Sequence, residues 1–172
     1  MEHRCARAAG FAVVLSLAVF SGWPARANAG EAAEPMMAEQ KSLKFAPIPG
    51  APKCATAAAV RGDPSKGAAV LMIKLASGCR VPWHWHTANE QLMIVSGNGT
   101  LEMKEGKKLP LRAGAYAAIP GKHVHQATCS ESCMFFNTTD GAFDIHYVDQ
   151  AGKEITAEEA LKKRPERKTQ AK

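Results

Sequence analysis

The segment GCRVPWHWHTANEQLMIVSG, residues 78–97, carries the most informative pattern in the chain. His84 and His86 stand two residues apart, so on a β-strand both imidazoles point to the same side. Two such rings, about 6–7 Å apart along one strand, can bind one metal ion from a single direction. Glu90 follows after a short bend and offers a carboxylate. Two histidines and one carboxylate on one side of an ion leave other coordination positions open.

A second segment, GAYAAIPGKHVH at residues 114–125, supplies a further candidate ligand. Gly114 and Pro120 frame one strand and its turn, and His125 comes just after, on the next strand. If the strands close into a barrel, His125 can complete a set of four ligands with the first segment. Three imidazoles and a carboxylate suit manganese, iron, nickel, cobalt, copper or zinc, so we expect one divalent ion without choosing among them.

The first segment resembles the first cupin motif position by position. Gly78 is followed by five residues and by His84-x-His86, then by three residues, Glu90, six residues and Gly97.

The second segment resembles the second cupin motif, with five residues between Gly114 and Pro120 and with His125 at the ligand position. It departs from that motif twice. Lys122 stands where a glycine is usual, and Cys129 stands where the motif ends in asparagine. Every ligand position is filled despite these departures. The resemblance covers about residues 55–148 and implies an all-β, cupin-type jelly-roll β-barrel with a metal ion in its mouth, and a homodimer.

Periodicity outside the two motifs also predicts an all-β domain. From residue 43, short apolar and β-branched runs alternate with Gly, Pro, Asp and Asn turns about every ten residues, which is typical of a sandwich or barrel of eight to ten strands. We therefore place the barrel at residues 43–150, after a flexible lead at 30–42. The predicted strand runs are residues 55–60, 68–76, 91–95, 100–103, 115–119, 123–128, 134–138 and 143–148.

The last part of the chain, residues 151–172, predicts a short helix and a basic tail. Thr156 can cap the helix and Glu159, three residues later, can close a capping box. Pro165 should end the helix after about two turns.

The first 29 residues predict a signal peptide. A basic start precedes an uncharged apolar run at residues 10–20, and Ala27-Asn28-Ala29 has the small residues that a signal peptidase cleaves after. A buried helix or a membrane anchor is the alternative, but the run is shorter than the about 20 residues that span a bilayer. We expect cleavage after Ala29 and a periplasmic or secreted protein that is not inserted in the membrane.

Four cysteines remain after removal of the signal, and an even count in an oxidising compartment permits two disulfides. Cys129 and Cys133 flank a three-residue turn between apolar runs, where they can lie opposite each other. That pairing would leave Cys54 to Cys79. Four buried free thiols are the alternative.

The formal net charge of +6 is concentrated at the carboxyl end. Residues 30–161 hold 13 basic and 14 acidic side chains and are close to neutral. We read the basic tail as a solvated end and expect no nucleic-acid partner.

Beyond the metal ligands, few side chains could act in catalysis. Glu90 itself, Tyr116 and His123 are the candidates, since strand parity places His123 on the face of His125. The alternative for His123 is a position at the turn in solvent, and we read His146 as exposed. Trp83 and Trp85 should point away from the ligands.

The predicted inner faces are otherwise apolar, so a compact pocket for a small carboxylate, enol or phenol is expected. A metal-dependent enzyme of oxidoreductase or dioxygenase type is our first interpretation. A non-catalytic module that binds a small molecule or a metal is the alternative, and the fold does not decide between them.

Overall fold

The computed structural model describes residues 35–162, and the predicted signal peptide and most of the basic tail lie outside them. Within the described part of the chain, residues 37–162 form one compact unit. Within residues 35–162, no helix is long and apolar enough to cross a membrane. The helical elements are η1 (Gln40–Ser42) and α1 (Ala157–Leu161), and the strands are β1 (Ala46–Pro47), β2 (Ala55–Arg61), β3 (Ala69–Leu75), β4 (Arg80–Trp85), β5 (Glu90–Ser96), β6 (Gly99–Met103), β7 (Lys108–Pro110), β8 (Tyr116–Ile119), β9 (His125–Cys129), β10 (Cys133–Thr139), β11 (His146–Val148) and β12 (Glu154–Ile155).

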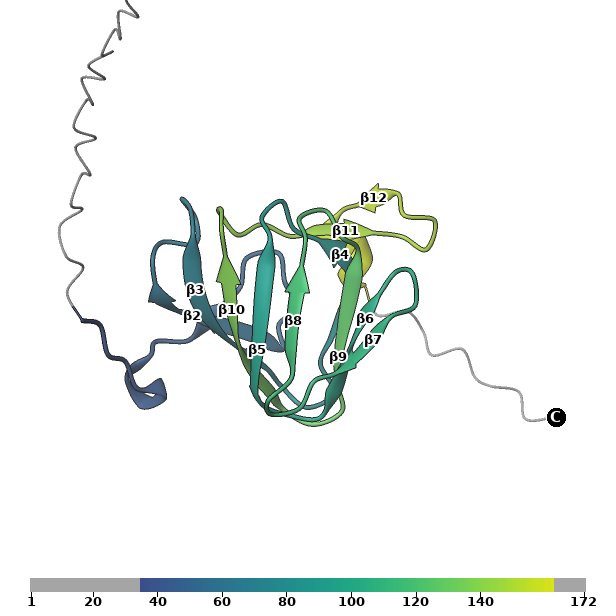
Figure 1. Ribbon diagram of the computed structural model, residues 1–172. Coiled ribbons are helices and arrows are strands. Elements are labelled where there is room, and N and C mark those ends of the chain that lie inside the picture. Colours follow the sequence, from purple (N-terminus) through teal and green to yellow (C-terminus); the bar gives the residue numbers. More distant parts are fainter. Residues whose placement is uncertain (1–34, 163–172) are drawn as a thin grey trace, which may run out of the picture. The chain divides into compact units, whose positions relative to one another are not determined.

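Two antiparallel six-stranded sheets build the domain. One has the order β1-β2-β3-β10-β5-β8 and the other β12-β11-β4-β9-β6-β7, and Figure 1 shows them as two walls joined at one end by the loops below β5, β8 and β9. Some neighbours in each sheet come from distant parts of the sequence, as when β10 pairs with both β3 and β5 and β4 pairs with β9. This is the all-β jelly-roll arrangement expected from the sequence.

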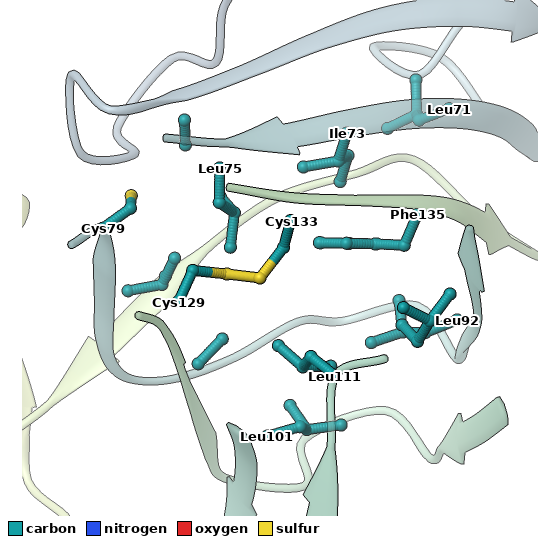
Figure 2. Packing of buried hydrophobic residues seen from close by; sticks show 14 of the residues in the cluster. Leu71, Ile73, Leu75, Cys79, Leu92, Leu101, Leu111, Cys129, Cys133 and Phe135 are labelled. Carbon is teal, nitrogen blue, oxygen red and sulfur yellow. A yellow bond between two sulfur atoms is a disulfide. The ribbon is translucent and has the colours of Figure 1, made fainter. Parts of the chain in front are cut away.

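Inward-facing apolar side chains of both sheets form the core. Along β10 the burial alternates, so that Cys133, Phe135, Asn137 and Thr139 are buried while the residues between them are less so. Figure 2 shows Phe135 and Leu92 packing near Leu111, which follows β7, and Leu101 of β6 in the other sheet. The β5 side chains Leu92 and Ile94 continue this apolar wall.

Both predicted disulfides are present. Cys54 pairs with Cys79 across a separation of 25 residues, and Cys129 pairs with Cys133 across four. The second bridge sits in the core beside Leu75 (Figure 2). Gly97 passes so close to it that an added Cβ would lie 2.7 Å from the Cys133 Cα, so this position requires glycine.

The carboxyl-terminal helix has the predicted cap but is shorter than expected. The Thr156 hydroxyl accepts from the Glu159 backbone N–H at 3.2 Å, and the Glu159 carboxylate accepts from the Thr156 N–H at 2.9 Å. The helix covers five residues, Ala157–Leu161, rather than about two turns. Pro165 lies outside the described residues.

Three sequence predictions of the strands need correction. The run at 143–148 is a strand only from His146, and the apolar residues before it, Phe143 and Ile145, line the cavity instead of pairing in a sheet. The run at 123–128 begins only at His125. The short strands β1, β7 and β12 were not predicted, because each has too few residues to show a periodic pattern.

Candidate metal centre

Four side chains from three strands and one loop meet inside the barrel. His84 lies on β4 and His125 opens β9, and the two residues are partners across these neighbouring strands. His86 follows directly after β4, and Glu90 opens β5 in the facing sheet. All four side chains are at most 5 % exposed. One ring nitrogen from each histidine lies within 4.8 Å of the others.

The orientation of two rings is fixed by carbonyls two residues earlier in the chain. The His84 Nδ1 lies 2.6 Å from the Pro82 carbonyl oxygen, and the His125 Nδ1 lies 2.8 Å from that of His123. A carbonyl oxygen can only accept, so each Nδ1 carries the hydrogen and donates it. Each Nε2 therefore keeps its lone pair, which is the form in which imidazole binds a metal ion.

His86 obtains the same arrangement from a distant segment. Its Nδ1 donates to the carbonyl oxygen of Asp144, which precedes β11. The Asp144 carboxylate in turn accepts from the Thr87 backbone N–H at 2.8 Å, next to His86. This pair of contacts joins the two segments and holds the third ring in its tautomer.

One carboxylate oxygen of Glu90 accepts a hydrogen bond, and the other faces two of the three histidines. Its Oε1 accepts from the Asn137 amide Nδ2 at 2.5 Å. Its Oε2 lies 3.3 Å from the Nε2 of His86 and 3.5 Å from the Nε2 of His125. Among the described residues this buried oxygen has no hydrogen-bond donor.

The three buried imidazoles could hold a divalent ion, and Glu90 lies beside two of them. Two ligand atoms that are each about 2.1 Å from one ion lie roughly 3.0–3.4 Å apart, close to the spacing of Oε2 from the two Nε2 atoms. The lone pairs of neutral imidazoles and a carboxylate oxygen converge, and nothing in the described part of the chain donates to them. Buried acceptors that face one another are unfavourable unless a cation lies between them.

Burial shifts the ionisation of all four groups. It lowers the pKa of His84 well below its usual value, helped by the neighbouring His125 and His86, and it lowers the pKa of His86 and His125 as well. Burial also raises the pKa of Glu90. The imidazoles are therefore neutral at pH 7 and ready to bind an ion, while the Glu90 charge is costly without one.

The linkage between these shifts and stability has opposite signs for the two residue types. The histidine pKa values are lower in the folded than in the unfolded state, so the metal-free protein loses stability as the pH falls below about 6.5. The Glu90 pKa is higher in the folded state, so ionisation of Glu90 costs stability as the pH rises above about 4.5.

Glu90→Gln should therefore stabilise the metal-free protein at pH 7 and weaken its metal affinity by more than about tenfold. The amide removes the buried charge and can donate to the two facing Nε2 atoms, but it is a poor metal ligand. Urea unfolding of the metal-free proteins at pH 5 and pH 7, with a competitive metal titration, measures both effects. Glu105→Gln is the control, because that carboxylate pairs with His123 on the surface. Equal metal affinity in wild type and Glu90→Gln would contradict the ligand assignment.

A cavity of about 60 Å³ adjoins the four side chains. Ile48 and Ala51, between β1 and β2, line it together with Phe143 and Ile145, which precede β11. Asn137 is the one polar residue besides the four candidate ligands among the described side chains that line it. The interior is therefore compact and largely apolar, as the inner-face pattern predicted.

Two predicted catalytic residues do not lie at this cavity. Tyr116 is 53 % exposed, and its hydroxyl donates to the Gln91 side chain at 3.2 Å. His123 precedes β9, so strand parity does not apply to it, and its Nε2 lies 2.6 Å from a carboxylate oxygen of Glu105 on the surface. The turn before it contains Lys122 at φ 63°. This is the left-handed region, which glycine, the usual residue of the motif at this position, adopts without steric cost. We therefore do not assign either residue a catalytic role.

The two tryptophans point away from the ligands as predicted. The Trp85 ring stacks on His146 with centroids 3.9 Å apart, and the Lys104 ammonium lies 5.1 Å from the Trp83 ring centroid. His146 also pairs with carboxylates of Asp144 and Glu154 at 3.2 and 2.8 Å. It belongs to a surface cluster and not to the cavity.

The contacts made by Asn137 and by the Asp144 carbonyl were not predicted from the sequence. Asn137 lies within a predicted strand and alternates with Phe135, so its inward parity was visible, and a polar side chain at an inward position requires a partner. The Asp144 carbonyl could not be found from the sequence, because a contact of the backbone with a residue 58 positions away does not depend on the Asp144 side chain.

Known structures resemble this fold at low sequence identity. The polyketide cyclase RemF from Streptomyces resistomycificus matches with a TM-score of 0.56 and 16% identity over 66% of this chain and 84% of that chain. An RmlC-like cupin from Ralstonia eutropha matches with a TM-score of 0.54 and 20% identity over 69% and 74%. The DMSP lyase DddQ from Ruegeria pomeroyi matches with a TM-score of 0.51 and 18% identity over 59% and 57%.

A search of curated proteins gave no significant match. The sequence model described as the ChrR cupin-like domain matches residues 33–144, well over half of the chain, and it includes all four candidate ligands. This chain belongs to the ChrR cupin-like domain family.

Proposed function

We propose that this protein is an exported cupin that holds one divalent ion through His84, His86, Glu90 and His125 and acts as a metal-dependent enzyme, of oxidoreductase type, on a small organic molecule. The observation that carries the proposal is the orphaned Glu90 Oε2, which faces two imidazole nitrogens inside an apolar barrel. A group of buried acceptors without a donor is a cation site by its chemistry.

The side chains around the four proposed ligands support an enzyme of oxidoreductase type. Among the described side chains that line the cavity, these ligands are the only ionisable ones. No separate general base or anion-binding side chain is available there, so the chain's own contribution is to orient a small molecule and exclude water. A bound divalent ion would supply Lewis acidity and, if it is redox-active, electron transfer.

The fold is compatible with catalysis. Two of its structural neighbours are named as a polyketide cyclase and a DMSP lyase. Their chemistries differ from each other, so the fold by itself does not select a reaction.

A non-catalytic metal- or ligand-binding module is the second candidate. The small size of the cavity favours it, because 60 Å³ is far below the roughly 300–1,000 Å³ of drug-sized ligand sites. A buried ion with a few trapped waters would suit a sensor or a storage site as well as an enzyme.

Expression of the full chain with its own leader tests export and metal binding together. We expect material from the periplasm or medium to begin at Gly30 by intact mass and to contain one divalent ion per chain by elemental analysis. We also propose a homodimer, supported by the exposed Met93, Val95 and Tyr116 on neighbouring strands β5 and β8, so the same material should sediment at twice the chain mass. Retention of Met1, or absence of any metal, would contradict the corresponding part of the proposal.

Catalysis is tested on protein reloaded with each of the six candidate metals. Small carboxylates, enols and phenols are offered under air, and dioxygen uptake and product formation are measured. Turnover that requires one particular ion supports the enzyme. Saturable binding without turnover for every ion favours the binding module.

A further inference from the structure

Asn137 lines the cavity and carries a buried acceptor that has no partner among the described residues. Its side chain is 2 % exposed and lines the cavity next to Glu90. Its Oδ1 has no hydrogen-bond donor among the described residues, although its Nδ2 is occupied by the Glu90 Oε1. A buried amide oxygen without a donor destabilises the protein, and a bound group that donates to it can recover that loss.

The chemistry of Glu90 fixes which amide atom is free. A carboxylate that ligates a metal is deprotonated and can only accept hydrogen bonds. The amide group that faces it must therefore be the N–H donor, so the oxygen is left to face elsewhere. Rotating the amide by half a turn would bring two acceptors together at 2.5 Å.

The geometry points to Asn137 as a specificity-determining residue that selects small ligands with a metal-binding oxygen and an O–H or N–H donor on a neighbouring atom. An α-hydroxy carbonyl, an enediol and a hydroxamate have this chemistry. The inference rests on the proposed metal site and names the class of molecule that this site takes.

The cavity disfavours simple carboxylates as ligands. A simple carboxylate that bound the ion through one oxygen would present only acceptors to the Asn137 Oδ1. No lysine or arginine among the described residues lines the cavity to compensate that contact. A volume of about 60 Å³ corresponds to roughly four to six water-sized positions, which limits the ligand to a few heavy atoms.

A matched pair of hydroxamates isolates the donor. Acetohydroxamic acid and N-methylacetohydroxamic acid bind metals through the same two oxygens, but the second has a methyl group in place of the N–H. Both are titrated into the cobalt-loaded mature protein, with the visible cobalt spectrum and calorimetry as readouts. In wild type, acetohydroxamic acid should bind at least about tenfold more tightly. In Asn137→Leu this ratio should fall to the residual effect of the methyl group's size.

Thr139→Val is the control. Its hydroxyl is another buried atom without a partner on the same face of β10, but it does not line the cavity, so the ratio should stay at the wild-type value. If Asn137→Leu fails to retain cobalt, Asn137→Thr keeps a hydroxyl donor for Glu90 and loses the amide oxygen.

The outcomes separate this inference from the proposed function. Wild-type protein that takes up no cobalt contradicts the metal site, and the inference fails with it. Cobalt binding with equal affinity for the two hydroxamates, or a ratio unchanged in the Asn137 variants, overturns the role of Asn137 and leaves the metal site standing.

Discussion

Replacement of both His84 and His86 by alanine should abolish stoichiometric metal binding. The two rings enter the site from one strand and its continuation, and both carry a free Nε2 because their Nδ1 atoms donate to backbone carbonyls. Either single replacement should weaken affinity by more than about a hundredfold, since loss of outer-sphere partners alone costs 10–100-fold. Elemental analysis and competition with a metal-sensitive dye measure the loss.

The matched control is His146→Ala. That imidazole lies on β11 beside the same strand but is paired with surface carboxylates and stacked on Trp85. Its replacement should leave the metal content unchanged. In wild type, metal occupancy should fall only when the pH drops below the lowered pKa values of the buried imidazoles, where protons compete for the Nε2 atoms. A full equivalent of metal retained without His84 and His86 would overturn the site.

Removal of the Cys54–Cys79 disulfide should lower the free energy of unfolding by about 3–4 kcal/mol. The bridge closes a loop of 25 residues, and the loss of chain entropy in the unfolded state grows with loop length. The loop includes β2 and β3, so the bridge connects both strands to the start of β4. Urea unfolding of Cys54→Ala/Cys79→Ala at neutral pH gives the value.

The second bridge provides an internal comparison. Cys129 and Cys133 are four residues apart, so the same relation gives about 2 kcal/mol for Cys129→Ala/Cys133→Ala. The order of the two effects is the expected result. Equal unfolding free energies for wild type and the Cys54/Cys79 variant would show that this bridge contributes nothing to stability.

Much of the fold was predictable because the deciding features are local. Alternation along β5 and β10 and the turn residues between strands follow directly from the period of a strand. The Cys129–Cys133 bridge was visible from a three-residue turn. The strand at 143–148 was overextended because Phe143 and Ile145 are apolar for a different reason, which is that they line the cavity.

The site residues likewise fall into those that local patterns predict and those that depend on contacts between distant segments. His84, His86, Glu90 and His125 come together as the spacing of the two motifs predicted, because strand parity and pairing determine their positions. Tyr116 and His123 were placed by proximity in sequence, and the turn at Lys122 breaks the parity on which the second depended. The Asn137 contact requires the pairing of β5 with β10, which are separated by more than thirty residues and which no local pattern connects.

The carbonyl acceptors behind the three imidazoles have an evolutionary consequence. Pro82, His123 and Asp144 each contribute a main-chain oxygen to this task, and any amino acid supplies that atom. The ring orientations are thus inherited with the path of the backbone and not with the identity of the supporting residues. Sequences that differ at positions 123 and 144 while keeping the loop lengths should retain the same nitrogen geometry, so a difference there does not indicate that a relative lacks the candidate metal site.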